Sequence, residues 1–142
     1  MIVRFYITLL ILTSVFSSCS KYEGTGGRSS ISGKIRIQQR LFINGSFVDS
    51  VAFEGAKEDV FILYGSDDTA LDDKVECSHD GTFKFDFLQP GTYTIFAYNE
   101  IFHTGPNQNN NDDDYYTNEP VSITVELGKK EQRDLGTITL IK

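Results

Sequence analysis

Residues 80–95 have the sequence DGTFKFDFLQPGTYTI, in which two alternating segments flank a turn. In the first segment aromatic residues alternate with charged ones, which predicts a strand whose buried face carries Phe83, Phe85 and Phe87. Gln89-Pro90-Gly91 predicts a tight turn, because proline fixes φ and glycine tolerates positive φ. A second strand is predicted over residues 92–98, with Tyr93, Ile95 and Ala97 on its apolar face.

The same period of two extends outward from this stretch in both directions. Asn44-Gly45 lies between two short apolar segments and predicts a two-residue hairpin turn. Gly136 predicts a β-bulge, because Leu135 is out of phase with Ile138 and Leu140. No segment has a helical period, so the sequence predicts an all-β sandwich. The other predicted strands are residues 31–38, residues 60–64 with both faces apolar, a weaker strand over 70–78, residues 121–127 and residues 135–141.

Residues 80–95 resemble the signature hairpin of carboxypeptidase-regulatory-like, transthyretin-like (prealbumin-like) domains, and residues 31–35 (ISGKI) resemble their first strand. The resemblance implies a seven-stranded Greek-key, Ig-like sandwich over residues 31–142, here with an additional N-terminal hairpin around Asn44-Gly45. It also implies an accessory domain in surface and carbohydrate-related systems, but it does not indicate one particular ligand. Tyr93 either resembles a tyrosine corner, its hydroxyl bonded to nearby backbone, or is an ordinary aromatic core residue.

The N-terminus has the pattern of a secretory signal peptide. Arg4 precedes the apolar residues 5–16, and small residues follow directly before Cys19. The apolar run is shorter than the about 20 residues that span a bilayer, although an uncleaved anchor is the alternative. Cys19 resembles the acylated cysteine of a bacterial lipobox, despite Phe16 where that family usually carries an aliphatic residue. We therefore expect a signal peptide at residues 1–18 and a lipidated Cys19, with residues 19–30 as a flexible tether.

Composition narrows the partners and the location. The chain has 13 basic and 20 acidic side chains, a net charge of −7, which argues against nucleic acid and against charge-driven binding to anionic lipids. Membrane attachment would come from the acyl chains on Cys19. Ser20 rather than Asp after that cysteine resembles the rule for sorting to the Gram-negative outer membrane, with the membrane face left open. If Cys19 is acylated, Cys77 has no second cysteine in the chain with which to form a disulfide. We expect it to be a small, buried apolar side chain.

Aromatic residues gather in the second half of the chain and form the candidate ligand or partner surface. Its members are Phe96, Tyr98, Phe102, Tyr115 and Tyr116. Exposed rings with polar handles suit contacts with a protein or a sugar. The alternative is that the rings are covered within the sandwich, since buried aromatic residues are common.

The remaining polar motifs indicate no cofactor and no catalytic centre. Residues 107–114 (NQNNNDDD) could hold a cation but lack the spacing of an EF-hand, and a solvated loop is the alternative. His79 and His103 lack metal-ligand spacing and are expected in solvated loops.

We therefore expect no enzyme, but a lipid-anchored envelope binding or adaptor module that presents its loops, especially residues 99–119, to a protein or glycan. A structural component of an envelope or secretion assembly, joined through edge strands, is the alternative; a hydrolase is a residual one.

Overall fold

The computed structural model describes residues 23–43, 46–65, 71–105 and 114–142. The predicted signal peptide, Cys19, the Asn44-Gly45 turn and residues 107–113 of the polar run lie outside the described residues. Among the described residues no helix is long and apolar enough to cross a membrane.

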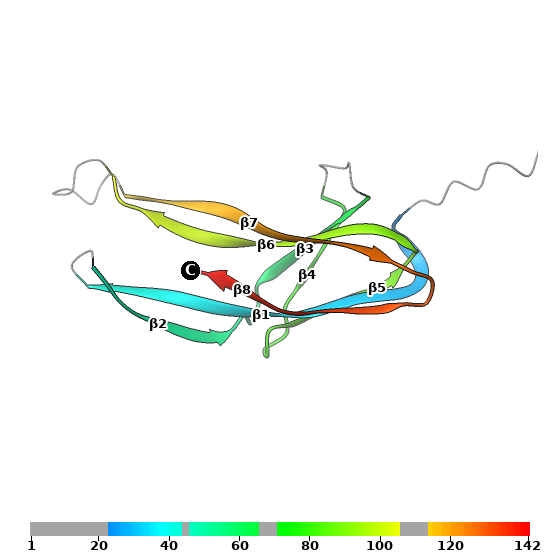
Figure 1. The fold of residues 1–142 in the computed structure, drawn as a ribbon, viewed down its shortest axis with the longest axis horizontal. Coiled ribbons are helices and arrows are strands. Elements are labelled where there is room, and N and C mark those ends of the chain that lie inside the picture. The colour runs from blue at the N-terminus through cyan, green and yellow to red at the C-terminus, as the bar shows by residue number, and fades with distance from the viewer. Residues whose placement is uncertain (1–22, 44–45, 66–70, 106–113) are drawn as a thin grey trace, which may run out of the picture.

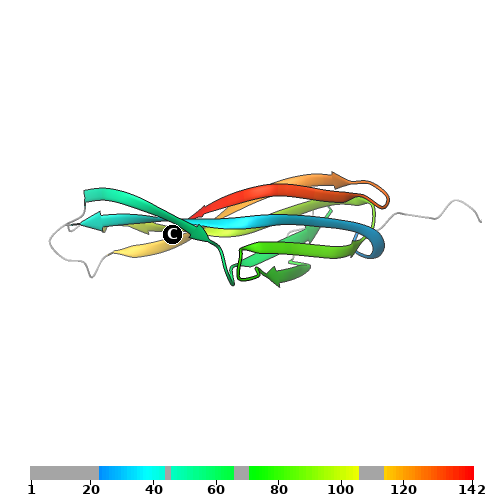
Figure 2. The same cartoon turned by 90° about the horizontal axis from the view of Figure 1, so that it is seen from below.

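The described residues form eight strands in two sheets, so the predicted all-β sandwich is confirmed (Figure 1). The first sheet contains β1 (Thr25–Ile43), β2 (Ser46–Glu54), β5 (Thr82–Leu88) and β8 (Gln132–Ile141). The second has the order β4 (Asp73–Glu76), β3 (Asp59–Tyr64), β6 (Gly91–His103) and β7 (Tyr115–Leu127), with each strand antiparallel to its neighbour. Figure 2 shows the molecule from below, where the long strands run along its long axis.

The 19-residue β1 organises the first sheet. One of its edges pairs with β5 over the N-terminal half and with β2 over the C-terminal half, both antiparallel. Its other edge pairs in parallel with β8, from Ser30↔Gln132 to Gln38↔Ile141. The pairing of Ile43 with Ser46 confirms the hairpin between β1 and β2.

The core lies between the sheets and follows the predicted alternation. Side chains buried to 6% exposure or less come from both sheets, and a central β3 flanked by β4 and β6 supplies two of them. Burial of this apolar area is the main favourable term in folding. The buried apolar residues are Ile31, Ile35, Ile37, Val60, Ile62, Cys77, Phe83, Phe85, Leu88, Tyr93, Ile95, Ala97, Leu127, Ile138 and Leu140.

Residues 80–95 do not form the predicted hairpin. β5 pairs with β1 in the first sheet, whereas β6 pairs with β3 and β7 in the second, so the chain crosses between sheets after Leu88. Phe87 stands outside the core, 71% exposed with φ 60°, and Leu88 takes the buried position instead. Irregular register between β1 and β5 near Leu88 breaks the alternation there.

The flexible tether was predicted over residues 19–30, but the structure has a strand in the C-terminal part of this range. β1 begins at Thr25, and Ser29 and Ser30 are buried. The Ser29 hydroxyl donates to the Gly128 carbonyl at 2.8 Å and accepts from the Glu131 amide at 3.1 Å. A Cβ at Gly27 would clash with the Leu88 carbonyl. The small residues in this segment therefore allow two strands to pack closely. A Gly/Ser-rich composition is equally typical of a flexible linker, so composition alone does not predict which of the two forms.

Two single-residue predictions are confirmed. Register shifts between β1 and β8 around Gly136, whose φ is 70°, which places the β-bulge where it was expected. Cys77 is buried at 3% exposure and makes no disulfide among the described residues. Burial, followed by the nearby Glu58 and Asp59 carboxylates, raises the pKa of the Cys77 thiol to about 11, so the group is an unreactive thiol at neutral pH.

A candidate binding cleft between two hairpin arms

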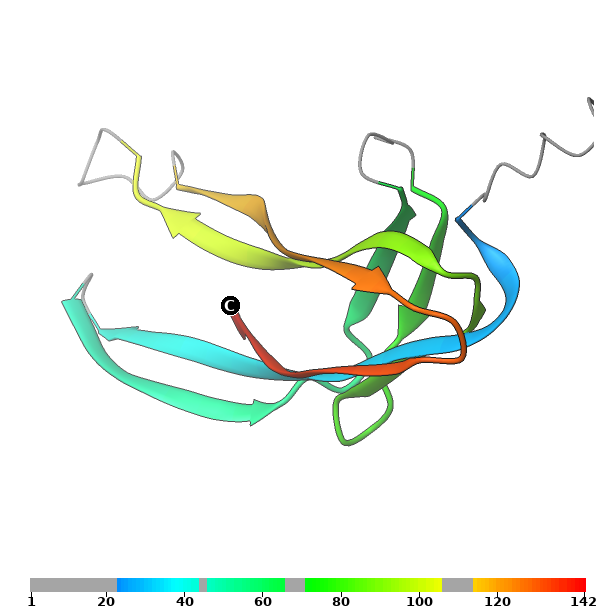
Figure 3. The ribbon, with the colours of Figure 1, turned by 45° about the vertical axis from the view of Figure 1, so that its right-hand side comes forward.

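Two long hairpins extend beyond the body of the sandwich in the same direction (Figures 1 and 3). The β1–β2 arm consists of Arg36–Glu54, and the β6–β7 arm consists of Ala97–Val121, each apart from its tip residues outside the description. The β6–β7 arm projects because β6 and β7 have 13 residues each whereas β3 has six and β4 four. The β1–β2 arm projects because β1 pairs with β5 only as far as Lys34 and with β8 only as far as Gln38. β8 ends between the two arms (Figure 3).

A cleft of about 310 Å³ lies where the two arms and the end of β8 meet. This volume is at the lower end of the range typical of ligand sites, about 300–1,000 Å³. The cleft combines apolar and charged groups from four strands and the residue after β8. Its lining residues are Gln39, Arg40, Glu100, Ile101, Phe102, Tyr116, Ile141 and Lys142.

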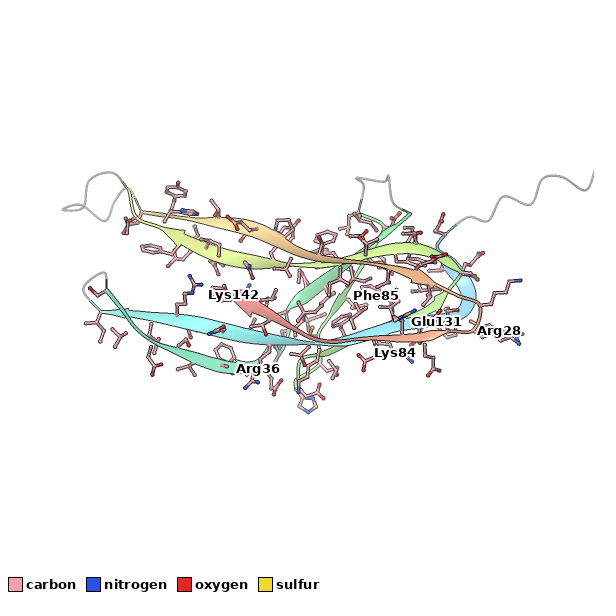
Figure 4. All side chains as sticks on the ribbon, in the orientation of Figure 1. Arg28, Arg36, Lys84, Phe85, Glu131 and Lys142 are labelled. Atoms are coloured by element: carbon pink, nitrogen blue, oxygen red, sulfur yellow. The ribbon has the colours of Figure 1, made fainter. Side chains whose placement is uncertain are left out.

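One hydrogen bond and one ion pair fix the inner end of the cleft. The Ile141 amide donates to Asn99 Oδ1 at 2.9 Å, which ties β8 to the β6–β7 arm. Lys142, labelled between the arms in Figure 4, pairs through Nζ with Glu58 Oε2 at 3.0 Å. Within the described ranges neither Arg40 nor Glu100 takes part in an ion pair. Both charges are therefore available to a ligand.

Only part of the predicted aromatic surface reaches this cleft. Phe102 and Tyr116 lie directly opposite each other on β6 and β7, with ring centroids 5.2 Å apart and planes tilted by 53°. Both rings line the cleft and are 42% and 63% exposed. The structure thus brings these two predicted residues together at an open site.

The other predicted aromatic residues belong to separate groups. Phe96 stacks on Phe61 at 5.1 Å, and Tyr98 packs edge-on against both rings at 5.6 Å. Tyr115 stacks on His103 at 4.9 Å, and this pair is on the opposite face of the hairpin from Phe102 and Tyr116 because strand side chains alternate. By the same alternation Phe96 and Tyr98 lie on the face of β6 that carries Phe102, so only Tyr115 lies on the opposite face from the other predicted residues.

The histidines differ from each other in their surroundings. His79 is exposed in the turn before β5, as predicted. His103 is not a loop residue: it ends β6, and its Nε2 lies 2.7 Å from Thr117 Oγ1. Its strand position was missed because the sequence pattern ended the strand at Tyr98.

A second hollow lies over β5 and the neighbouring parts of β1, β8 and β4. It is larger, about 730 Å³, but shallow, and its basic residues Lys34 and Lys84 already pair with Glu54 at 2.9 Å and Asp86 at 2.8 Å. The cleft between the arms is the better candidate site, since it combines two exposed aromatic rings with an arginine that pairs with no carboxylate among the described residues.

Sequence reasoning reached half of the cleft. Residues 99–119 were predicted to present loops to a partner, and four lining residues fall within them, but residues 99–103 and 115–119 belong to β6 and β7. The lining residues of β1 and of the C-terminal end have no distinctive sequence pattern. The site forms because some strands are longer than their neighbours. In the sequence, strand length is indicated only by the number of residues between successive turns.

Comparisons with known proteins show no family for this chain. Neither a family model nor a curated protein matches the chain, so the resemblance to carboxypeptidase-regulatory-like domains stays a prediction. Among solved structures, a "putative carbohydrate binding protein" from Pseudomonas aeruginosa aligns with a TM-score of 0.49 and 13% sequence identity. The alignment covers 84% of this chain and 92% of that one.

Proposed function

We propose that this chain is a non-catalytic binding or adaptor module of a Gram-negative cell envelope, anchored to the outer membrane by acyl chains on Cys19. The observation that supports binding is the cleft between the two arms, where exposed Phe102 and Tyr116 lie beside charged Arg40 and Glu100. Aromatic and arginine side chains are the residue types that contribute most at binding sites.

Among the residues that the structure describes, no three His, Cys, Asp or Glu side chains lie close enough together to hold a metal ion.

Two matched double variants test the site. Phe102→Ala/Tyr116→Ala removes the aromatic pair at the cleft, and His103→Ala/Tyr115→Ala removes the neighbouring pair on the opposite face of the same strands. The lipidated protein is used to recover partners from its own solubilised envelope, with protease and glycosidase treatment to separate protein from glycan. We expect the first variant to lose about tenfold or more of the recovered partner, and the second to retain it. Equal recovery by both variants would reject the cleft as the binding site.

The anchor is tested separately. We expect the mature protein to begin at Cys19 with a mass increased by acyl chains, and to enter the detergent phase on partitioning. Cys19→Ser should be found in the aqueous phase, since a single changed residue removes the acylated group. An unmodified mass for the native protein would reject the anchor without affecting the cleft.

A further inference from the structure

Two strand edges beside the cleft have no hydrogen-bonded neighbour among the described residues. β3 pairs with β6 only from Tyr93 to Phe96, so residues 97–103 of β6 have a partner, β7, on one edge alone within the described chain. Residues 41–43 of β1 likewise pair with β2 but with no strand on the β8 side among the described residues. Open edges of this kind are templates for an added strand.

The β8 ladder leads directly into the space between these edges. The Lys142 amide donates to the Gln38 carbonyl at 3.2 Å, and the Arg40 amide donates to the Lys142 carbonyl at 3.1 Å. At the same point the outward amide of Ile141 is bonded to the Asn99 side chain. The side-chain oxygen of Asn99 thus accepts the hydrogen bond that a backbone carbonyl of a neighbouring strand would otherwise accept.

We propose that the cleft accepts an extended segment of a partner polypeptide, which adds as a strand in line with β8, between the free edges of β1 and β6. This rests on the proposed function, because it names the occupant of the same site. A segment of about five residues spans roughly 16 Å at about 3.3 Å per residue. Its backbone would pair with the open edges, and alternate side chains would contact Ile101 and Phe102.

The geometry favours a polypeptide over a sugar. Only a polypeptide presents alternating N–H and C=O groups at the repeat of a strand edge. Phe102 and Tyr116 are tilted by 53°, so they do not form one flat surface on which a sugar ring would stack. Arg40 and Glu100 have opposite charges, which suits a peptide with mixed side chains better than a uniformly charged polymer.

The test extends the chain at its C-terminus, so that the protein itself provides the added strand. Thr-Val-Thr-Val-Thr is appended after Lys142, and Thr-Pro-Thr-Pro-Thr is appended as the control, because proline has no amide hydrogen to pair. Backbone amide exchange is measured by NMR for those amides of residues 41–43 and 97–103 that point away from β2 and β7, because successive amides of a strand point to opposite edges. We expect the valine extension to slow exchange along these edges by about tenfold or more, and the proline extension to leave it unchanged. The valine-extended protein should also lose its envelope partner, whereas the proline-extended one should retain it.

Each other outcome overturns the inference. Exchange that is equally fast with both extensions means that the cleft does not accept a strand, even if Phe102→Ala/Tyr116→Ala abolishes partner recovery and so supports the proposed function. Retained partner binding while the valine extension is ordered means that the partner binds elsewhere. A partner removed by glycosidase, or a dimer of this chain that the extension dissociates, would replace the polypeptide partner with a glycan or a second copy.

Discussion

Tyr93 connects the start of β1 to the crossing between the two sheets. Its hydroxyl donates to the Gln89 carbonyl at 2.8 Å and accepts from the Gly24 amide at 3.1 Å, while the side chain is fully buried. The tyrosine-corner interpretation is therefore confirmed. Burial raises the pKa of this hydroxyl, so it stays protonated and able to donate at physiological pH.

Tyr93→Phe should lower the free energy of unfolding by about 1–3 kcal/mol, because it leaves a buried amide and a carbonyl without their partner. Tyr64→Phe is the matched control: its ring packs against Tyr93 at 5.7 Å, and its hydroxyl makes no hydrogen bond to the described residues. Urea denaturation measures both. The prediction is wrong if the two variants are equally stable.

Cys77 gives a pH dependence whose sign follows from its raised pKa. The unfolded thiol deprotonates at a lower pH than the folded one, so stability is fully present below the unfolded pKa and is lost as pH rises above it. We expect the free energy of unfolding to fall by about 1 kcal/mol between pH 8 and pH 10. Cys77→Ala should remove this part of the slope in urea titrations; an identical slope would contradict the assignment.

At the scale of the strands, the bulge at Gly136 keeps β8 in phase with the core on both sides of an extra residue. A Cβ at this position would contact nothing within 4 Å, so the cost of substitution comes from the backbone at φ 70° alone. Before the bulge Asp134 is opposite Ser32, and after it Thr137 is opposite Lys34. Ile138 and Leu140 consequently point into the core.

Gly136→Ala should lower stability by about 1 kcal/mol, whereas Gly136→Asn should cost less, since asparagine tolerates the left-handed region. Thermal or urea unfolding measures the difference between the two variants. Equal stability of alanine, asparagine and glycine at this position would show that the bulge carries no backbone strain.

Alternation predicted the strands well wherever one face is buried. Ile31, Ile35, Phe83 and Tyr93 were all placed on inward faces because apolar and polar residues alternate around them. The pattern failed where the alternation itself breaks, as at Phe87, whose positive φ has no counterpart in the sequence. It also could not assign β5 and β6 to different sheets, because a crossing and a hairpin use the same turn residues.

At the scale of the whole molecule, the two arms and the end of β8 create a site that no single segment contains. Arg40 and Glu100 are 60 positions apart in the sequence, yet they line the same cleft. Phe102 and Tyr116 were predicted as part of a surface because they are aromatic, and the structure places them at this cleft. The remaining lining residues follow from strand length and sheet topology, which local pattern does not determine.

The central claim is that a partner binds in the cleft between the arms. Its most direct test incorporates a photo-reactive phenylalanine analogue at position 102 or, separately, at position 115, and irradiates the protein in its native envelope. The two positions are on the same hairpin but on opposite faces. The account predicts a cross-linked partner from position 102 and none from position 115. A partner cross-linked from position 115 alone would contradict it.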